Sequence, residues 1–401
     1  MTVLVRVLWR RHNGRILHVA VALVLAAALW RLGNELPRLI AAPDGAFDLE
    51  LRHGEVRLWF AGWPIYTEAA RGDYPPASYA ILWPLLGWLP IGAARLLWAA
   101  TAVAGLASLA AIAVRESCAE TRSERLLIFL APFATYSASA AFGVGQLINH
   151  VLPLVVAGLL LLARGRGTWR DDVMATGLLV PALVKPTLSA PFFWFVCFVP
   201  RRIRPIALVS IAYVLITAFA ALFQSGDLAT ILFGWLAEGP QPLQGHANVN
   251  KVLALAGLRA WMLPVSLGLL IALGVWVFRN RRADRWLLLG VIAIVGRFFV
   301  HHRLYDDLLL FVPMVTLFRI AKRGPADGSD VTAGILFTLM LGSLVAPAQL
   351  IGARGALSLI MEVGQAAIWL GALAFLARRV RQEQAAEAEP VVALPAADAA
   401  S

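Results

Sequence analysis

Apolar runs close to the length of a membrane-spanning helix recur along most of this chain. A bilayer core about 30 Å thick needs about 20 apolar residues in helical form. The runs end at arginines or at turns rich in glycine and proline. With 60% hydrophobic and only 15% charged residues, a soluble domain would expose a very large apolar surface. The sequence therefore predicts an all-α, polytopic bundle of membrane helices.

We expect about 12 transmembrane helices, within a range of about 10 to 13. The predicted spans lie near residues 16–33, 95–114, 125–142, 147–163, 173–188, 189–200, 205–223, 261–278, 286–300, 308–318, 332–350 and 361–377. The apolar segment 76–90 is short and bounded by prolines, which indicates a re-entrant or interfacial helix. Residues 1–380 then form one transmembrane domain with a first outer loop at 34–94. Residues 381–401, rich in alanine, glutamate and proline, are expected to form a disordered cytoplasmic tail.

The distribution of basic residues supports this topology. Cytoplasmic segments would carry 23 of the 35 lysines and arginines, as the positive-inside rule requires. Of the other 12, six lie in the long segment 31–95, where the rule acts weakly. Making 76–90 a full span would invert every later loop. We therefore expect a multi-pass protein of a bacterial inner membrane with both termini in the cytoplasm.

The net charge of +11 does not indicate nucleic-acid binding, because the arginines are dispersed between apolar runs. At the N-terminus, four arginines precede an apolar segment that ends at Trp30, and this charge order resembles a signal peptide. An uncleaved anchor is the favoured interpretation, since the apolar stretch approaches spanning length.

Polar residues from five separate segments fall on the predicted outer side. They are Asp44, Asp48 and Tyr66 in the first loop, Gln146 and Asn149, Lys185, Asn248 and Asn250 in the loop 224–260, and the segment from Arg297 to Asp307. Their convergence on one face predicts a functional site there.

Residues 47–60 alternate apolar and charged positions and are typical of an interfacial amphipathic helix. Asp48 lies at its start, where the helix dipole favours a carboxylate. Such a carboxylate can act as a general base. The simpler interpretation is a helix N-cap, because aspartate is common there.

Several motifs, in this order, resemble glycosyltransferase family 87, whose members are multi-span enzymes of the GT-C fold. These motifs are Asp48, then Gly62-Trp-Pro-Ile-Tyr66, Tyr74-Pro75-Pro76, Gly145-Gln146-Leu-Ile-Asn149, Lys185-Pro186 and His301-His302-Arg303-Leu-Tyr305-Asp306-Asp307. The chain departs from the family pattern at Arg52 and His53, where the family often has aromatic residues. This departure leaves the acceptor open.

The resemblance implies transfer of a hexose, commonly mannose, from a polyprenyl-phosphate donor to a glycolipid or glycan acceptor on the outer side, with inversion. The family's first-loop aspartate corresponds to Asp48, which would be the base. Lipid-monophosphate donors need no metal, so we expect none and no other cofactor. The Gly-rich fingerprints of nucleotide binding are absent from the sequence, which agrees with a lipid-linked donor.

Cationic side chains would bind the donor phosphate, and Lys185 is the first candidate. It is one of three lysines against 32 arginines and lies before Pro186 at an outer helix end. A lysine that only snorkels from a helix end is an equal alternative. The other candidates are His301, His302 and Arg303. The alternative interpretation is that these three residues form only a solvated cluster at the membrane interface. A metal site would need a third ligand such as Asp306 or Asp307.

Tyr66, Gln146, Asn149 and Asp307 are the candidates for binding sugar or acceptor hydroxyls. Two other functions stay open at this point. One is a transporter or flippase for a lipid-linked sugar, although such proteins place ionisable groups near the bilayer midplane. The other is a ligase or polymerase of surface polysaccharide that uses a pyrophosphate-linked oligosaccharide. The sequence does not indicate an oligomeric state.

Overall fold

The computed structural model describes residues 2–66, 72–164, 167–237, 246–323, 328–345 and 355–388. All regular secondary structure in these ranges is helical, with 17 α-helices and two short 3₁₀ helices, so the predicted all-α class is confirmed. In chain order the helices are α1 (Thr2–Ala41), α2 (Phe47–Phe60), α3 (Pro76–Leu86), α4 (Ile91–Glu116), α5 (Arg122–Ala134), α6 (Tyr136–Val144), α7 (Ile148–Ala163), α8 (Trp169–Ala182), α9 (Pro186–Phe198), α10 (Ile203–Ala221), α11 (Leu228–Ala237), α12 (Val249–Leu255), η2 (Arg259–Trp261), α13 (Met262–Arg279), α14 (Arg285–Phe298), η3 (Leu304–Leu310), α15 (Phe311–Arg323), α16 (Ser329–Val345) and α18 (Ala356–Ala388).

Several helices are long and apolar enough to cross a bilayer, which makes the chain a polytopic membrane protein. Within the described residues these segments are Gly14–Ala41, Ile91–Glu116, Ile203–Ala221, Arg259–Arg279 and Ala356–Ala385. The pair α5 and α6 adds a sixth span if the two bent helices are counted as one. The remaining predicted spans correspond to shorter helices, so the number twelve stays a prediction. The predicted span 332–350 is described only to Val345, where α16 ends.

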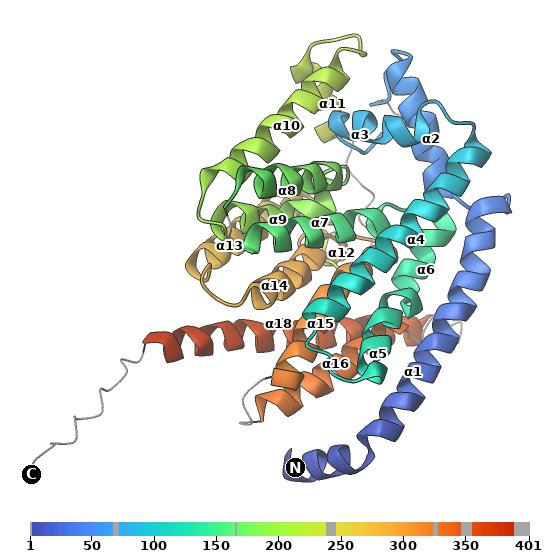
Figure 1. Ribbon diagram of the computed structural model, residues 1–401. Coiled ribbons are helices and arrows are strands. Elements are labelled where there is room, and N and C mark those ends of the chain that lie inside the picture. Colours follow the sequence, from blue (N-terminus) through green and yellow to red (C-terminus); the bar gives the residue numbers. More distant parts are fainter. Residues whose placement is uncertain are drawn as a thin grey trace, which may run out of the picture.

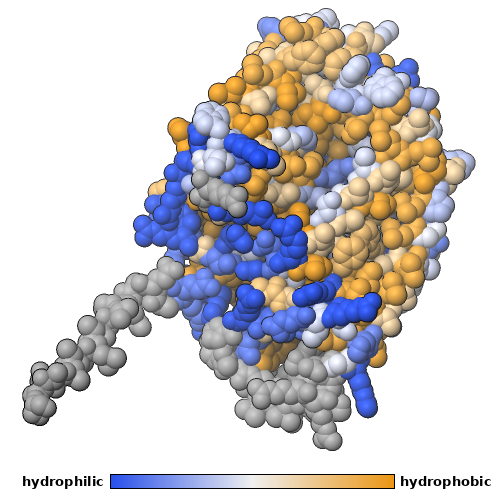
Figure 2. Space-filling view, viewed as in Figure 1, coloured by the Kyte–Doolittle hydropathy of each residue, from blue (hydrophilic) through white to orange (hydrophobic). Residues whose placement is uncertain are grey.

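The surface agrees with this assignment. Large apolar side chains such as Leu23, Val214 and Ile271 are exposed on the long helices, as lipid-facing residues are. Figure 2 shows hydrophobic residues over much of the visible face, whereas hydrophilic residues gather toward the lower left.

Helix breaks interrupt two of the predicted spans. The predicted span 125–142 divides at Thr135 into α5 and α6, whose axes differ by 44°. Thr135 caps α6 by accepting a hydrogen bond from the Ala138 N–H at 3.2 Å. The predicted span 173–188 ends at Ala182, and Lys185 follows in a non-helical conformation because Pro186 disfavours the helical one before it.

The segment predicted to be the first outer loop contains the two short helices that the sequence predicts, α2 and α3. Helix α3 has 11 residues, or about 16 Å, and is too short to cross a bilayer core. Helix α2 exposes Phe47, Leu51 and Leu58 but buries Asp48 and Arg52. Asp48, Arg52 and Glu55 therefore face the protein interior, whereas Glu50 and Arg57 are exposed. In Figure 1, α2 and α3 lie beside α10 and α11 at the end of the molecule far from the N-terminus.

The segments predicted to be cytoplasmic contact one another at the opposite end. Arg285 pairs with Glu116 at 3.0 Å, and Lys322 pairs with Glu124 at 2.9 Å. Arg202 pairs with the buried Asp172 at 2.7 Å. Ion pairs thus join the segments near residues 116–124, 285 and 322, and a separate pair joins those near residues 172 and 202.

The predicted disordered tail begins too early. Helix α18 continues to Ala388, through the first part of the predicted tail 381–401. The sequence there consists mostly of alanine, glutamate, glutamine and arginine, which are strong helix formers. Residues 389–401 lie outside the described part of the chain.

One fully buried ion pair connects α14 to η3. Arg297 donates to Asp307 through Nε, and the Tyr136 hydroxyl donates to the same carboxylate. His246 lies 3.1 Å from Asp307, and Arg297 also donates to the His246 carbonyl. Arg297 and Asp307 are both inaccessible to solvent. Each therefore neutralises the charge of the other, which water cannot reach.

Topology can be tested by cysteine labelling on the two sides of α4. This helix has 26 residues, or about 39 Å, which exceeds the bilayer core. In a chain with Cys118 and Cys197 replaced by serine, Asp44→Cys should react with a membrane-impermeant maleimide in intact cells. Glu120→Cys should react only after permeabilisation. Labelling of both positions from the same side would show that α4 does not span the membrane.

Removal of the buried Asp307 carboxylate should destabilise the fold. Asp307→Ala leaves the Arg297 guanidinium buried without its counter-charge, which costs about 3–5 kcal/mol. We expect a clear fall in the thermal unfolding midpoint of the purified protein in detergent. The control is Glu120→Gln, which removes an exposed pair with Lys322 and should cost at most about 1 kcal/mol. Equal midpoints for the two variants would contradict this role of Asp307.

Candidate active site

Asp48 is the second residue of α2, and its carboxylate points to another part of the chain. Ala46, in a left-handed conformation, precedes the helix instead, so the N-cap interpretation of Asp48 is wrong. Asp48 Oδ2 accepts a hydrogen bond from Gln146 Nε2 at 2.8 Å. The Ala46 N–H donates to the Gly143 carbonyl at 2.8 Å, which holds the start of α2 against the end of α6.

Gln146 lies in the turn between α6 and α7, and its amide joins three elements. Its Nε2 donates to Asp48 and, at 3.0 Å, to the Tyr305 hydroxyl of η3. Its Oε1 accepts from Lys185 Nζ at 3.4 Å. The turn depends on Gly145, which has a φ of +75° and would place a β-carbon 2.5 Å from Leu49 Cβ.

Lys185 connects this amide to the segment after α14. Its Nζ donates to Asp306 Oδ1 at 3.0 Å and lies 5.0 Å from the centre of the Tyr305 ring. The ammonium is largely buried, at 13% side-chain exposure, and is held by specific groups. This favours a functional lysine over one that only snorkels to the interface.

Asp306 is in turn held by His302 and by the backbone of Arg303. His302 Nδ1 lies 3.1 Å from Asp306 Oδ2, and the Arg303 N–H donates to the same oxygen at 3.2 Å. His302 Nε2 lies 2.9 Å from the Gly296 carbonyl, so contacts on both sides fix the ring. Although burial alone would raise the pKa of Asp306, Lys185 and His302 hold it well below its usual range. Asp306 therefore stays ionised near neutral pH.

His301 has different properties from its neighbour. Burial, assisted by the nearby positive charges, lowers the pKa of His301 to about 4. The imidazole is therefore neutral near pH 7 and takes part in hydrogen bonds rather than in charge neutralisation. Its buried Nδ1 has no hydrogen-bond partner among the described residues.

The loop before α13 closes this network from another direction. The His246 N–H donates to the His302 carbonyl at 2.8 Å, and Asn248 Nδ2 donates to the same carbonyl at 3.3 Å. Asn250, in α12, accepts from the Ser266 hydroxyl of α13 at 3.1 Å and so joins these two helices. All five segments that the sequence places on the outer side therefore meet in the structure.

Three candidate residues lie away from the hydrogen bonds around Gln146. Asn149 is fully buried and donates to the Ala138 carbonyl at 3.4 Å. It does not share a helix face with Gln146, because α7 begins after Gln146, at Ile148. Tyr66 donates to the Tyr74 carbonyl at 2.6 Å, and Asp307 belongs to the buried pair with Arg297.

Sequence reasoning gave no role to Tyr305 and considered Asp306 only as a metal ligand. It also assigned nothing to Glu55, which lies on the inward face of α2 with Asp48 and Arg52. Burial raises the pKa of Glu55 to about 7, although the Arg52 guanidinium opposes the shift. Arg52 and Glu55 follow Asp48 by four and seven residues, and this helical spacing could have indicated that the three share a face.

The arrangement joins a carboxylate, a cation and a neutral imidazole within one interior region. Asp48 can accept a proton, Lys185 can attract an anion, and His301 can donate or accept a hydrogen bond. Among the described residues, no three His, Cys, Asp or Glu side chains are grouped so that they could hold a metal ion.

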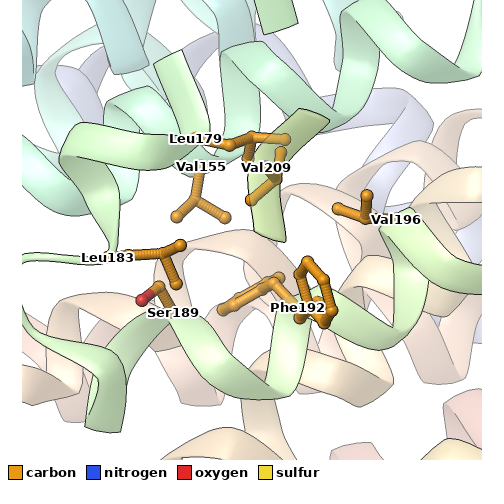
Figure 3. Close-up of a pocket in the computed structure, with 8 residues that line it drawn as sticks. Val155, Leu179, Leu183, Ser189, Phe192, Val196 and Val209 are labelled. Atoms are coloured by element: carbon orange, nitrogen blue, oxygen red, sulfur yellow. The ribbon is translucent and has the colours of Figure 1, made fainter. Parts of the chain in front are cut away.

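An apolar pocket begins beside the break that contains Lys185. It lies among α7, α8, α9 and α10, and Figure 3 shows the apolar side chains pointing into it. Leu183 and Ser189, two and four residues from Lys185, belong to its lining. The Ser189 hydroxyl donates to the Lys185 carbonyl at 3.4 Å, so the pocket and the ammonium share one segment of backbone.

Comparison with known proteins identifies the chain. A family model described as glycosyltransferase family 87 matches residues 73–302, more than half of the sequence. The matched range includes Gln146, Lys185, His301 and His302, whereas Asp48 precedes it. No curated protein and no solved structure matches the chain. The protein, with its several membrane helices, belongs to glycosyltransferase family 87.

Proposed function

We propose that this membrane glycosyltransferase transfers a hexose, with mannose favoured, from a polyprenyl-phosphate donor to a glycolipid or glycan acceptor. The reaction takes place on the outer face of a bacterial inner membrane and inverts the anomeric centre. Asp48 is the general base. The observation that supports this most directly is the Gln146 amide, which contacts Asp48 with one end and Lys185 with the other.

In the proposed reaction, Asp48 takes the proton of the acceptor hydroxyl as its oxygen attacks the anomeric carbon. The bond between that carbon and the phosphate oxygen breaks, and the electron pair leaves with the polyprenyl phosphate. The negative charge on the leaving group must then be stabilised by nearby donors. Gln146 holds the Asp48 carboxylate in position as a positioning residue.

Lys185 is suited to bind the phosphate. An ammonium has three N–H donors, and its hydrogen bonds to Gln146 and Asp306 use two of them. Asp306 fixes the ammonium in position, and the neutral His301 can donate a further hydrogen bond. His302 and Arg303 contribute by holding Asp306, and Arg303 adds positive charge nearby.

The two alternatives use the same region differently. A flippase would move the lipid-linked sugar without breaking the bond to phosphate, and a ligase or polymerase would take a pyrophosphate-linked oligosaccharide. Membership of a glycosyltransferase family favours bond formation over transport. Incubation of the purified protein with labelled monophosphate and pyrophosphate donors separates the three.

Asp48→Asn tests the base. The amide keeps the shape of the side chain but cannot accept the proton, so kcat should fall about 10²- to 10⁴-fold. Donor binding should remain, because the phosphate contacts lie elsewhere. The matched control is Asp44→Asn in the same loop, which is exposed and paired with Arg38. Full transfer activity in Asp48→Asn would overturn the assignment.

Lys185→Gln tests the phosphate contact. Loss of a charge-assisted hydrogen bond should raise the KM for the polyprenyl-phosphate donor about 10- to 100-fold. The KM for the acceptor should change little. The control is Lys251→Gln, a lysine that pairs with Glu362 instead. Equal donor KM values for the two variants would remove Lys185 from the donor site.

A further inference from the structure

The inward face of α2 carries a second carboxylate beyond the proposed base. Asp48, Arg52 and Glu55 are spaced by four and three residues, which places them on one side of the helix. Seven residues of helix separate Asp48 from Glu55 by about 10 Å along the axis. The helix buries these three charged side chains together with the apolar Leu49, Val56 and Trp59, although packing alone would not require the charged ones to be buried.

One carboxylate oxygen of Glu55 is hydrogen-bonded, and the other has no hydrogen-bond partner among the described residues. Its Oε2 accepts from Arg52 Nη1 at 2.5 Å. Its Oε1 is buried and has no hydrogen-bond partner among the described residues. The residue as a whole is only 3% exposed. Because buried carboxylate oxygens are almost always hydrogen-bonded, Oε1 has the character of an acceptor waiting for a donor from a ligand.

Arg52 fixes this carboxylate from the open side. Its guanidinium also pairs with Asp73 at 2.7 Å and lies 4.1 Å from the centre of the Tyr74 ring. The Asp73 side chain is 47% exposed, so the charged cluster reaches the surface at this edge. Arg52 therefore links the buried Glu55 to a carboxylate that reaches the surface.

Aromatic residues border the same region. The Trp59 and Tyr79 rings stack with centres 4.8 Å apart, and Tyr66 meets Trp59 edge-on at 5.7 Å. Glu55 is close enough to Tyr66 and Tyr79 for its charge to act on both phenols. The Trp59 and Tyr79 rings are fully buried, so recognition of a polyhydroxylated ligand falls to the carboxylate, to which its hydroxyls can donate.

We propose that Glu55 is a specificity-determining residue for the acceptor and that its free oxygen accepts a hydrogen bond from a second hydroxyl of the acceptor sugar. The reacting hydroxyl lies at Asp48, and the rest of the sugar extends along α2 toward Glu55 and Arg52. The acceptor is therefore a glycoside rather than a simple alcohol or a hydroxyamino acid. This inference rests on the proposed function, which supplies the acceptor hydroxyl at Asp48.

The probes are octyl glycosides of mannose, glucose and galactose, with octanol and a serine-containing peptide as sugar-free acceptors. Purified full-length protein should transfer to at least one glycoside, and neither octanol nor the peptide should be used. For the active glycoside, Glu55→Gln should raise the acceptor KM at least about tenfold, and donor KM and donor hydrolysis should stay unchanged. Glu50→Gln is the matched control, since Glu50 lies on the same helix, is 45% exposed and pairs with Arg95 instead.

A series of monodeoxy glycosides locates the contact. Wild-type protein should lose affinity for one deoxy position besides the reacting one, and Glu55→Gln should be insensitive to that position. If Glu55→Gln folds poorly, the wild-type series still decides, because an unchanged KM for every non-reacting deoxy position overturns the inference. If the protein transfers the sugar to octanol or to the peptide, and this transfer requires Asp48, the inference about the acceptor is overturned but the proposed function is not. Absence of any Asp48-dependent transfer overturns the proposed function as well.

Discussion

Two adjacent carboxylates, Asp306 and Asp307, hold the interior of the site together. They lie in a 3₁₀ helix, where successive side chains are about 120° apart, and therefore point to different partners. Asp306 binds Lys185 and His302, whereas Asp307 binds Arg297. Because an unpaired charge in a membrane protein's interior is costly, these bonds fix how the surrounding segments meet.

Breaks in the helices bring polar groups to this centre. Gln146 occupies the turn before α7, and Lys185 occupies the break between α8 and α9. Irregular backbone inside a membrane protein is tolerated where it is buried in protein or lines a cavity. In this chain the irregular segments bind one another through Gln146, Lys185 and Asp306. The side chains that hold the helix breaks together are therefore also the ones available for chemistry. A site of this kind needs few polar residues, provided each has a fixed partner.

Helix α2 completes the site because three of its charged side chains, Asp48, Arg52 and Glu55, point inward. Phe47, Leu51 and Leu58 are exposed, which suits contact with lipid, while Asp48 and Glu55 face the protein. The helix thus presents the proposed base at one end and a second carboxylate further along. Such an arrangement lets one rigid element position both the reacting hydroxyl and the rest of an acceptor sugar.

The sequence by itself determined the helical class, the membrane as solvent and the short helices α2 and α3, since these follow from apolar run length and proline positions. The sequence also predicted that the segments of Asp48, Gln146, Lys185 and His302 lie close together. The predicted spans and the distribution of basic residues assign these segments to the same side of the membrane. Only the tertiary structure decided which side chains touch. Asp306 and Asp307 are neighbours with the same chemistry, and nothing in their order shows that one meets Lys185 and the other a buried arginine. That choice depends on the direction of each side chain after packing.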